Sequence, residues 1–208
     1  MLKKLFIVFA VIIGIVVLVV AALFISSWTS RPKTDKEFLS QLKGEVVFTR
    51  DIKGQGSEIL KYSFNDQKIA TVYQCDGVCD YPKWSEDGKN IIFYKPNNDM
   101  TDSIYQLTSI GTDLQLVGNI KLSAEDIYPR VEGINIKSGD LFMVTNGQEK
   151  LIYDAKYDGK FNTGVSYVSW SPDKKYLIFV DNRYTIYITD TNGNISKLTI
   201  GSAPNWKY

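Results

Sequence analysis

One phrase recurs four times along the chain, and this repetition constrains the fold more than any single residue. The sequence YPKWSEDGKNIIF at residues 81–93 returns as YVSWSPDKKYLIF at residues 167–179. A weaker copy begins with YPRV at residue 128 and reaches GDLFM at residues 139–143, and a truncated copy, APNW, begins at residue 203. Repeats spaced by about 40 residues are typical of β-propeller blades. The spacing therefore predicts an all-β repeat architecture.

Apolar alternation and turn residues divide each repeat into four short strands. The inner strand carries the opening residues of the phrase. The second strands are expected at residues 45–50, 90–95, 140–145 and 176–181, and the third strands at 58–64, 103–108, 150–156 and 185–190. The outer strands are expected at residues 68–74, 114–120, 161–164 and 195–200.

The chain enters this pattern on a second strand and leaves it on an inner strand. Residues 203–208 are therefore expected to act as a clasp that completes the first blade, because an unpaired inner strand would expose an open edge. This predicts a small, four-bladed β-propeller with blades at 44–81 together with 203–208, 82–128, 129–167 and 168–202. Two chains that share a larger ring are the alternative.

The phrase resembles the TolB-type β-propeller repeat, whose signature is a Pro-x-Trp-Ser-Pro-Asp-Gly-Lys run followed by a short apolar strand. The resemblance covers residues 44–208 and is weakest at 128–143, where Val131 replaces Trp and Glu132-Gly133 interrupts the turn. It implies a propeller fold and a position outside the cytoplasmic membrane. The serine and aspartate of the motif are expected to shape the turn and not to catalyse.

Residues 5–25 contain no charged or strongly polar side chain. A helix of this length spans about 31 Å, which matches a hydrocarbon core of about 30 Å. We expect a signal anchor, that is, one transmembrane α-helix after a short cytoplasmic head at residues 1–4. A cleaved signal peptide and a buried soluble helix are the alternatives. Basic residues flank both ends of the span, so the outward orientation of the propeller follows from the short head and from the resemblance.

Residues 26–43 are predicted to connect the anchor to residues 44–208. The spacing of Thr34 and Glu37 is that of a capping box, in which each side chain satisfies a backbone amide at the start of a helix. Phe38, Leu39 and Leu42 follow on one helical face. The connector is therefore expected to contain a short helix that packs on the rim of the propeller, with a partner-binding helix as the alternative.

Composition excludes several classes of function. The chain contains no histidine, which removes Ser-His and Cys-His mechanisms. Residues 1–43 hold six of the 24 basic residues and two of the 23 acidic ones, which leaves residues 44–208 with a net charge of about −3. A nucleic-acid partner is therefore not expected. No motif predicts a cofactor, a metal site or a catalytic residue.

Long connections carry most of the loop acids. In a four-stranded meander, the connection after the second strand and the connection before the next inner strand emerge at the same end, which we call the long-loop end. Binding residues concentrate on loops that a rigid scaffold holds, so this end is the predicted partner site, and a basic partner follows from its charge. Solvated surface loops are the alternative. The candidate binding residues are Asp51, Asp76, Asp80, Asp99, Asp102, Glu125, Asp126 and Asp181.

Cys75 and Cys79 are the two cysteines of the chain. Two neighbouring cysteines outside the cytoplasm are expected to form a disulfide. Free thiols, metal binding and redox chemistry stay open as alternatives, although a metal would need further ligands of the usual type.

These observations predict a membrane-anchored, non-catalytic propeller that serves as a protein-binding or scaffold module of the cell envelope. It would contact the lipid bilayer through residues 5–25 and bind another envelope protein. One alternative is a ligand- or carbohydrate-binding sensor, which would show a pocket lined by exposed Trp or Tyr. The other is a carboxylate-based hydrolase, which would show two carboxylates facing one pocket.

Overall fold

The computed structural model describes residues 12–20, 32–99, 101–155 and 164–207. It divides into two compact units, residues 1–33 and residues 34–208, which we describe separately. Residues 12–20 are helical, and no helix within the described ranges has the length and apolar character needed to span a membrane. The predicted head at 1–4, the two ends of the predicted anchor at 5–25 and residues 26–31 of the connector lie outside the described residues.

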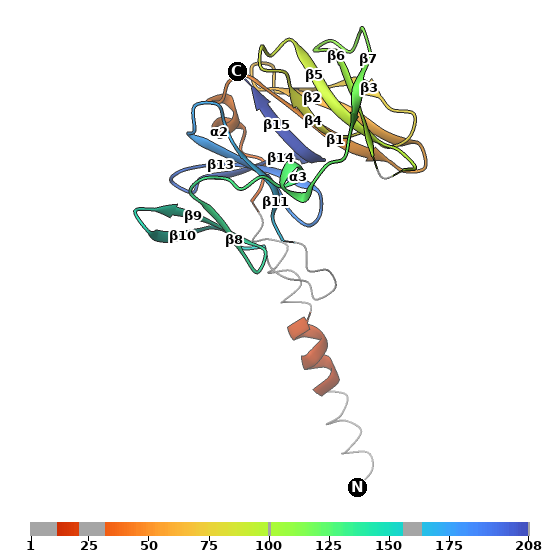
Figure 1. The fold of residues 1–208 in the computed structure, drawn as a ribbon. Helices are drawn as coiled ribbons and strands as arrows, with labels where there is room; N and C mark the ends of the chain where they lie inside the picture. The colour runs from red at the N-terminus through yellow and green to blue at the C-terminus, as the bar shows by residue number, and fades with distance from the viewer. Residues whose placement is uncertain (1–11, 21–31, 100, 156–163, 208) are drawn as a thin grey trace, which may run out of the picture. The chain divides into compact units, whose positions relative to one another are not determined.

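The described part of residues 34–208 forms four antiparallel sheets, consistent with a small β-propeller (Figure 1). Sheet A contains β1 (Glu45–Ile52), β2 (Gly56–Ser63), β3 (Lys68–Gln74) and the C-terminal β15 (Ser202–Lys207). Sheet B contains β4 (Asp80–Trp84), β5 (Asn90–Pro96), β6 (Asp102–Thr108) and β7 (Gln115–Ile120). Sheet C contains β8 (Ile134–Lys137), β9 (Asp140–Thr145) and β10 (Gln148–Tyr153). Sheet D contains β11 (Ser166–Trp170), β12 (Tyr176–Val180), β13 (Thr185–Asp190) and β14 (Ile195–Ile200). The all-β prediction is confirmed.

Sheet C departs from the predicted pattern. Its inner strand was expected from residue 128, but the strand begins at Ile134, because the short helix α3 (Ala124–Ile127) precedes it and Tyr128 caps that helix. Ser123 and Asp126 form a capping box that stabilises the helix. The predicted outer strand at 161–164 falls, except for Gly164, outside the described residues. In sheets A, B and D, the observed strands begin and end within two residues of the predicted positions.

The sheets pack in the order B, A, D, C. Sheet A lies between two cores, because Val46 and Phe48 pack toward sheet D whereas Val47, between them, packs toward sheet B. Sheet C packs on sheet D through Leu141 and Met143. Among the described residues, no buried apolar cluster joins sheet B to sheet C. The closed ring is therefore not shown, although three of its four interfaces are packed.

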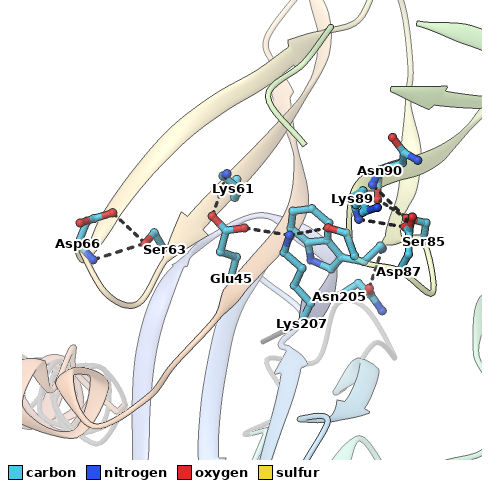
Figure 2. A network of polar contacts seen from close by, with 12 residues as sticks. Glu45, Lys61, Ser63, Asp66, Ser85, Asp87, Lys89, Asn90, Asn205 and Lys207 are labelled. Carbon is cyan, nitrogen blue, oxygen red and sulfur yellow. Dashed lines mark hydrogen bonds and ion pairs between the residues drawn. The ribbon is translucent and has the colours of Figure 1, made fainter. Parts of the chain in front are cut away.

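The repeated motif builds the same turn twice. Between β4 and β5, the Ser85 hydroxyl donates to Asp87 at 2.6 Å and accepts from the Asn90 amide at 3.0 Å (Figure 2). Between β11 and β12, Ser171 makes the equivalent bonds with Asp173 and Tyr176 at 2.7 and 3.0 Å. These side chains are engaged in local hydrogen bonds, as expected of residues that shape a turn.

The two turns differ at the position that needs a left-handed backbone. Gly88 adopts φ of 67° in the first turn, and Lys174 adopts φ of 57° in the second. A residue with a Cβ is strained in this region, whereas glycine is not. The second turn therefore has the same shape as the first, but with backbone strain at Lys174 that Gly88 avoids in the first turn.

The ends of the folded unit meet in sheet A, where β15 pairs antiparallel with β1. Glu45 of β1 forms ion pairs with Lys61 at 2.8 Å and with Lys207 of β15 at 3.2 Å (Figure 2). Burial alone would raise the pKa of Glu45, but the bonds from Lys61 and Lys207 outweigh burial and lower it. The pairing thus places a partly buried carboxylate between two partly buried cations.

The C-terminal strand also holds sheet B. Lys207 Nζ lies 3.7 Å from the centroid of the Trp84 ring, a cation–π contact, and donates to the Gly88 carbonyl at 2.7 Å. The Asn205 side chain accepts from the Trp84 amide at 3.0 Å (Figure 2). On the other side, Trp206 is 6% exposed and packs against Phe64 with a ring separation of 4.8 Å and against Tyr176 of sheet D with a ring separation of 5.9 Å. One strand therefore joins three sheets.

The connector helix α2 (Lys36–Ser40) packs on this unit. Leu39 and Leu42 are buried in the core that sheets A and D share, as the sequence predicted. The predicted cap was wrong by one residue, because Asp35, and not Thr34, accepts from the Phe38 amide at 3.0 Å. An aspartate at this position also places a negative charge at the start of the helix, where the helix dipole favours it.

Cys75 and Cys79 form a disulfide with a Cα–Cα separation of 6.0 Å. Both residues are buried in the core between sheets A and B. Ser57 of β2 donates its hydroxyl to the Cys79 carbonyl at 3.0 Å and accepts from the Cys79 amide at 2.7 Å. The bridge therefore fixes the start of β4 against sheet A.

Replacing Trp206 by Ala should destabilise the fold by about 3–5 kcal/mol, because it removes a large buried side chain from a shared core. The same substitution at Trp170, the half-buried residue at the equivalent repeat position, is the matched control and should cost less. Denaturant unfolding of both variants measures the difference. Equal losses would contradict the clasp role of β15.

Replacing Cys75 and Cys79 together by Ala should lower the free energy of unfolding by about 2 kcal/mol, the entropic effect of a short closed loop. Unfolding curves of the oxidised, reduced and double-Ala proteins provide the measurement. The reduced protein should unfold close to the double-Ala variant. Unchanged stability on reduction would show that the loop keeps its conformation without the bridge.

Candidate binding site at the long-loop end

The inner strands of sheets A, B and D share a local distortion at the start of the repeated phrase. Tyr81, Tyr167 and Ala203 occupy the same repeat position and have φ of 51°, 49° and 47°. The pairing register shifts at each of them, which is the mark of a β-bulge. A bulge re-aims the side chains around it, so three sheets turn the first residues of their inner strands in an unusual direction.

Three tyrosines lie together at this position. The Tyr167 ring centroid lies 6.0 Å from that of Tyr81 and 5.2 Å from that of Tyr128. The Tyr128 and Tyr167 hydroxyls form a hydrogen bond at 3.4 Å. Burial raises the pKa of Tyr167, and the hydrogen bond with Tyr128 and the charge of Asp80 raise it further. Tyr167 is therefore a neutral hydroxyl at physiological pH.

Asp80 adjoins this tyrosine cluster. Its carboxylate accepts from the Tyr81 amide at 2.9 Å and from the Thr49 hydroxyl at 3.4 Å. Burial raises the pKa of Asp80, and the charges of Asp51 and Asp102 raise it further. Two neighbouring acids thus contribute to the raised pKa of Asp80, in addition to its burial.

A cavity of about 980 Å³ opens beside the tyrosine cluster, between β8 of sheet C and β11 of sheet D. Its wall includes Tyr128 and Tyr184, which are 52% and 62% exposed, together with Tyr167. Arg130, Asp181 and Asn182 supply polar groups. The volume lies at the upper end of the range of small-molecule sites, about 300–1,000 Å³.

The predicted acids have different surroundings in the structure. Asp181 is buried and accepts from the amides of Arg183 and Thr185 at 2.9 Å and from the Tyr153 hydroxyl at 3.2 Å, so it shapes the β12–β13 turn. Bonds from the Thr101 side chain and amide lower the pKa of Asp99, and bonds from Ser123 lower that of Asp126. Asp76 and Glu125 are exposed. Asp51, Asp80 and Asp102 are the members that the structure brings into electrostatic contact.

The tyrosines of the site were not predicted as binding residues. Tyr81 and Tyr167 open the two clearest copies of the phrase, and Pro82 follows one of them. Their shared position in the repeat could have indicated that the two tyrosines occupy equivalent places in their sheets. The left-handed backbone could not be predicted, however, because glycine is the residue that normally indicates it. Neither a tyrosine nor the alternation of apolar residues does so.

No protein-family model matches the sequence, and no curated protein matches it. Among solved structures, TolB from Acinetobacter baumannii is 17% identical with a TM-score of 0.32, over 78% of this chain and 43% of TolB. The tricorn protease is 13% identical with a TM-score of 0.32, over 77% of this chain and 23% of the protease. Oligogalacturonate lyase from Vibrio parahaemolyticus is 9% identical with a TM-score of 0.31, over 76% of this chain and 51% of the lyase. The chain spans about half of these structures or less, and at these TM-scores the likeness bears neither on function nor on the arrangement of the sheets.

Replacing Asp80 by Asn should stabilise the protein at pH 7. The raised pKa means that the folded state binds a proton at Asp80 more readily than the unfolded chain, whose aspartates titrate near pH 4. The stability that the neutral carboxyl contributes is present below about pH 4 and is lost as the pH rises through the folded pKa. Urea unfolding from pH 3 to pH 7 should show that the free energy of unfolding of the variant increases relative to that of the parent protein as the pH rises. The exposed Asp76→Asn variant is the control and should follow the parent.

Proposed function

We propose that this chain is a membrane-anchored, non-catalytic binding module that holds a basic segment of another envelope protein at its long-loop end. The proposal is carried by the contiguity of the three acids, the tyrosine cluster and the cavity. Asp80 adjoins Tyr81, Tyr81 contacts Tyr167, and Tyr167 lines the cavity. Asp51, Asp80 and Asp102 do not line the cavity, whose wall includes Arg130, so a partner would reach from the cavity to these acids across Tyr167 and Tyr81.

The charge favours a cationic group. A lysine or arginine placed near Asp80 would remove the repulsion among Asp51, Asp80 and Asp102 that helps to raise the pKa of Asp80. Aromatic rings attract the same cations through their negative faces. The attraction to the carboxylates and the attraction to the aromatic rings act on the same cationic side chain. Both therefore support a partner that presents lysine or arginine on a short segment.

The cavity favours binding over hydrolysis. Glycoside hydrolysis by carboxylates needs two of them across one pocket. The residues that line this cavity include one carboxylate, Asp181, and its oxygens accept two backbone amides and the Tyr153 hydroxyl. A carboxylate engaged in this way is suited to holding a turn, which supports the non-catalytic proposal.

The disulfide supports a position outside the cytoplasm. Disulfides persist in oxidising compartments and are rare in the cytosol. The Cys75–Cys79 bridge lies in a core, where it contributes to the fold. Together with the apolar residues 5–25, it supports a chain that is anchored in a membrane and folds on the extracytoplasmic side.

A saccharide ligand is the second candidate, and the exposed Tyr128 and Tyr184 rings favour it. A tyrosine ring offers a flat apolar surface and a polar hydroxyl, which suit the faces and edges of a sugar ring. Asn182 and Arg130 supply hydrogen-bond donors in the same cavity. Binding of a saccharide in the cavity would not require Asp80, whereas binding of a basic segment would.

Calorimetric titration of the full chain in detergent with an oligolysine peptide, and separately with a neutral cello-oligosaccharide, distinguishes the two. We expect the peptide to bind, to lose at least tenfold in affinity in the Asp80→Asn, Asp102→Asn double variant, and to weaken as salt rises. Glu86→Lys at the opposite end is the control and should leave binding unchanged. Saccharide binding that is lost in Tyr184→Ala and kept in the double variant would establish the second candidate. Peptide binding that depends on Glu86 and not on Asp80 would overturn the first.

A further inference from the structure

We propose that Arg130 gives the cavity between β8 and β11 a carboxylate-binding site, in which the partner segment places an acidic group. Among the described residues that line this cavity, Arg130 and Asp181 carry a charge. The inference deepens the proposed function and rests on it for the basic group of the partner. It adds that the segment is bipolar, with an acidic group at a set distance from the basic one.

The two charged side chains of the cavity differ in their engagement. Asp181 is 3% exposed and accepts from the amides of Arg183 and Thr185 and from the Tyr153 hydroxyl. Arg130 is exposed, and no ion pair between described residues includes it. The guanidinium of Arg130 is therefore the charge that a ligand in this cavity can reach.

The acidic residues nearest to Arg130 in the sequence have other partners. Glu132 pairs with Lys174 of the β11–β12 turn at 3.4 Å. Asp126 accepts from the Ser123 hydroxyl at 2.6 Å and takes part in the capping box of α3. Because an arginine stays charged throughout the physiological pH range, Arg130 offers a full positive charge to a ligand.

The surroundings of Arg130 suit a carboxylate. Asn182 and Tyr184 belong to the same wall and carry further hydrogen-bond donors, and a carboxylate accepts several such bonds. Val131 and Ile134 add apolar surface. An ion pair beside apolar surface is screened less by water than one on an open surface. The planar fork of a guanidinium also matches the two oxygens of a carboxylate.

A row of three tyrosine rings connects the cavity to the acids and sets the spacing of the two partner groups. Tyr128 lines the cavity with Arg130 and lies 5.2 Å from Tyr167, which lies 6.0 Å from Tyr81, the residue after Asp80. An extended chain advances about 3.3 Å per residue, so about three to four residues cover this row. The acidic and basic groups of the partner are therefore expected about four positions apart.

The pair of charged regions favours a protein segment over a small acid as the source of the carboxylate. A small acid would satisfy Arg130 and leave the charges of Asp51, Asp80 and Asp102 as they are in the free protein. A segment with both kinds of side chain balances both regions at once. Complementary charges of this kind fix the direction and register in which a segment binds.

Calorimetric titration of the full chain in detergent with two blocked peptides tests the site. In the first peptide a glutamate precedes two lysines by four positions, and in the second a glutamine replaces the glutamate. The parent protein should bind the glutamate peptide about tenfold more tightly, because of the ion pair with Arg130. General attraction to an acidic surface would favour the glutamine peptide, which has the larger positive charge.

Arg130→Gln should abolish the preference for the glutamate peptide. Arg183→Gln is the matched control, because Arg183 is exposed and lies between Asn182 and Tyr184 but is not among the residues that line the cavity. This control removes the same charge and should keep the preference. Equal affinity of the parent protein for both peptides, or a preference that survives Arg130→Gln, would overturn the proposal.

Two further titrations separate this inference from the proposed function and from a saccharide ligand. The Asp80→Asn, Asp102→Asn variant should weaken both peptides alike and keep the preference. If it changes neither affinity while the preference still requires Arg130, the carboxylate site stands and the basic-segment proposal fails. Cellobiouronic acid that binds more tightly than both neutral cellobiose and the glutamate peptide would overturn the assignment to a protein segment. Circular dichroism of each variant confirms that it is folded.

Discussion

The pairing of β15 with β1 is the interaction on which the packing of the sheets depends. β15 completes sheet A, and its side chains alternate between neighbours, as expected of a strand. Trp206 enters the core shared with sheet D, whereas Asn205 and Lys207 contact the Trp84 end of sheet B. Without these contacts, sheets B and D would each lose part of their contact with sheet A, whose other strands supply the rest of both cores.

The structure also explains why the tyrosines meet. A left-handed residue in an otherwise extended strand changes the direction of the chain, and here the change occurs at the same position in three sheets. The inner strands of sheets B and D both lie against β15 of sheet A, so side chains from sequence-distant repeats converge. Tyr81 and Tyr167 are 86 positions apart in sequence, yet their ring centroids are 6.0 Å apart. The tyrosine cluster of the candidate site is thus a consequence of the repeat, whereas Asp51, Asp80 and Asp102 lie outside the repeated phrase.

Much of the fold could be predicted from the sequence. Strands in sheets A, B and D follow from alternation and turn residues, and the pairing of the two ends follows from the half-repeat at residue 203. Sheet C could not be predicted in the same way, because Val131 and Glu132 do not supply the turn and the tryptophan that fix the inner strand elsewhere. The helix cap was misplaced by one residue for a similar reason, since Thr34 and Asp35 are both competent caps and only tertiary contacts, such as the bond from the Asp35 amide to Ser196, distinguish them.

The candidate site was less accessible to sequence reasoning. Strand order predicts that the acids lie at one end, but it could not predict their partners, because burial and hydrogen bonding decide whether a carboxylate shapes a turn or lies beside other charges. Asp181 and Asp80 are both loop-end aspartates in the sequence, yet Asp181 accepts several donors in the core and Asp80 faces two further acids. A difference of this kind arises from tertiary structure.

The pairing of β1 with β15 has a consequence for how the fold forms. Glu45 pairs with Lys207, so the inner edge of β1 stays unfilled until a strand 162 positions further along the sequence is available. Contacts between residues so distant in sequence slow folding, because a long loop must close before they form. During that interval β1 is an open edge, and a nascent chain that emerges among copies of itself is most prone to mispairing there.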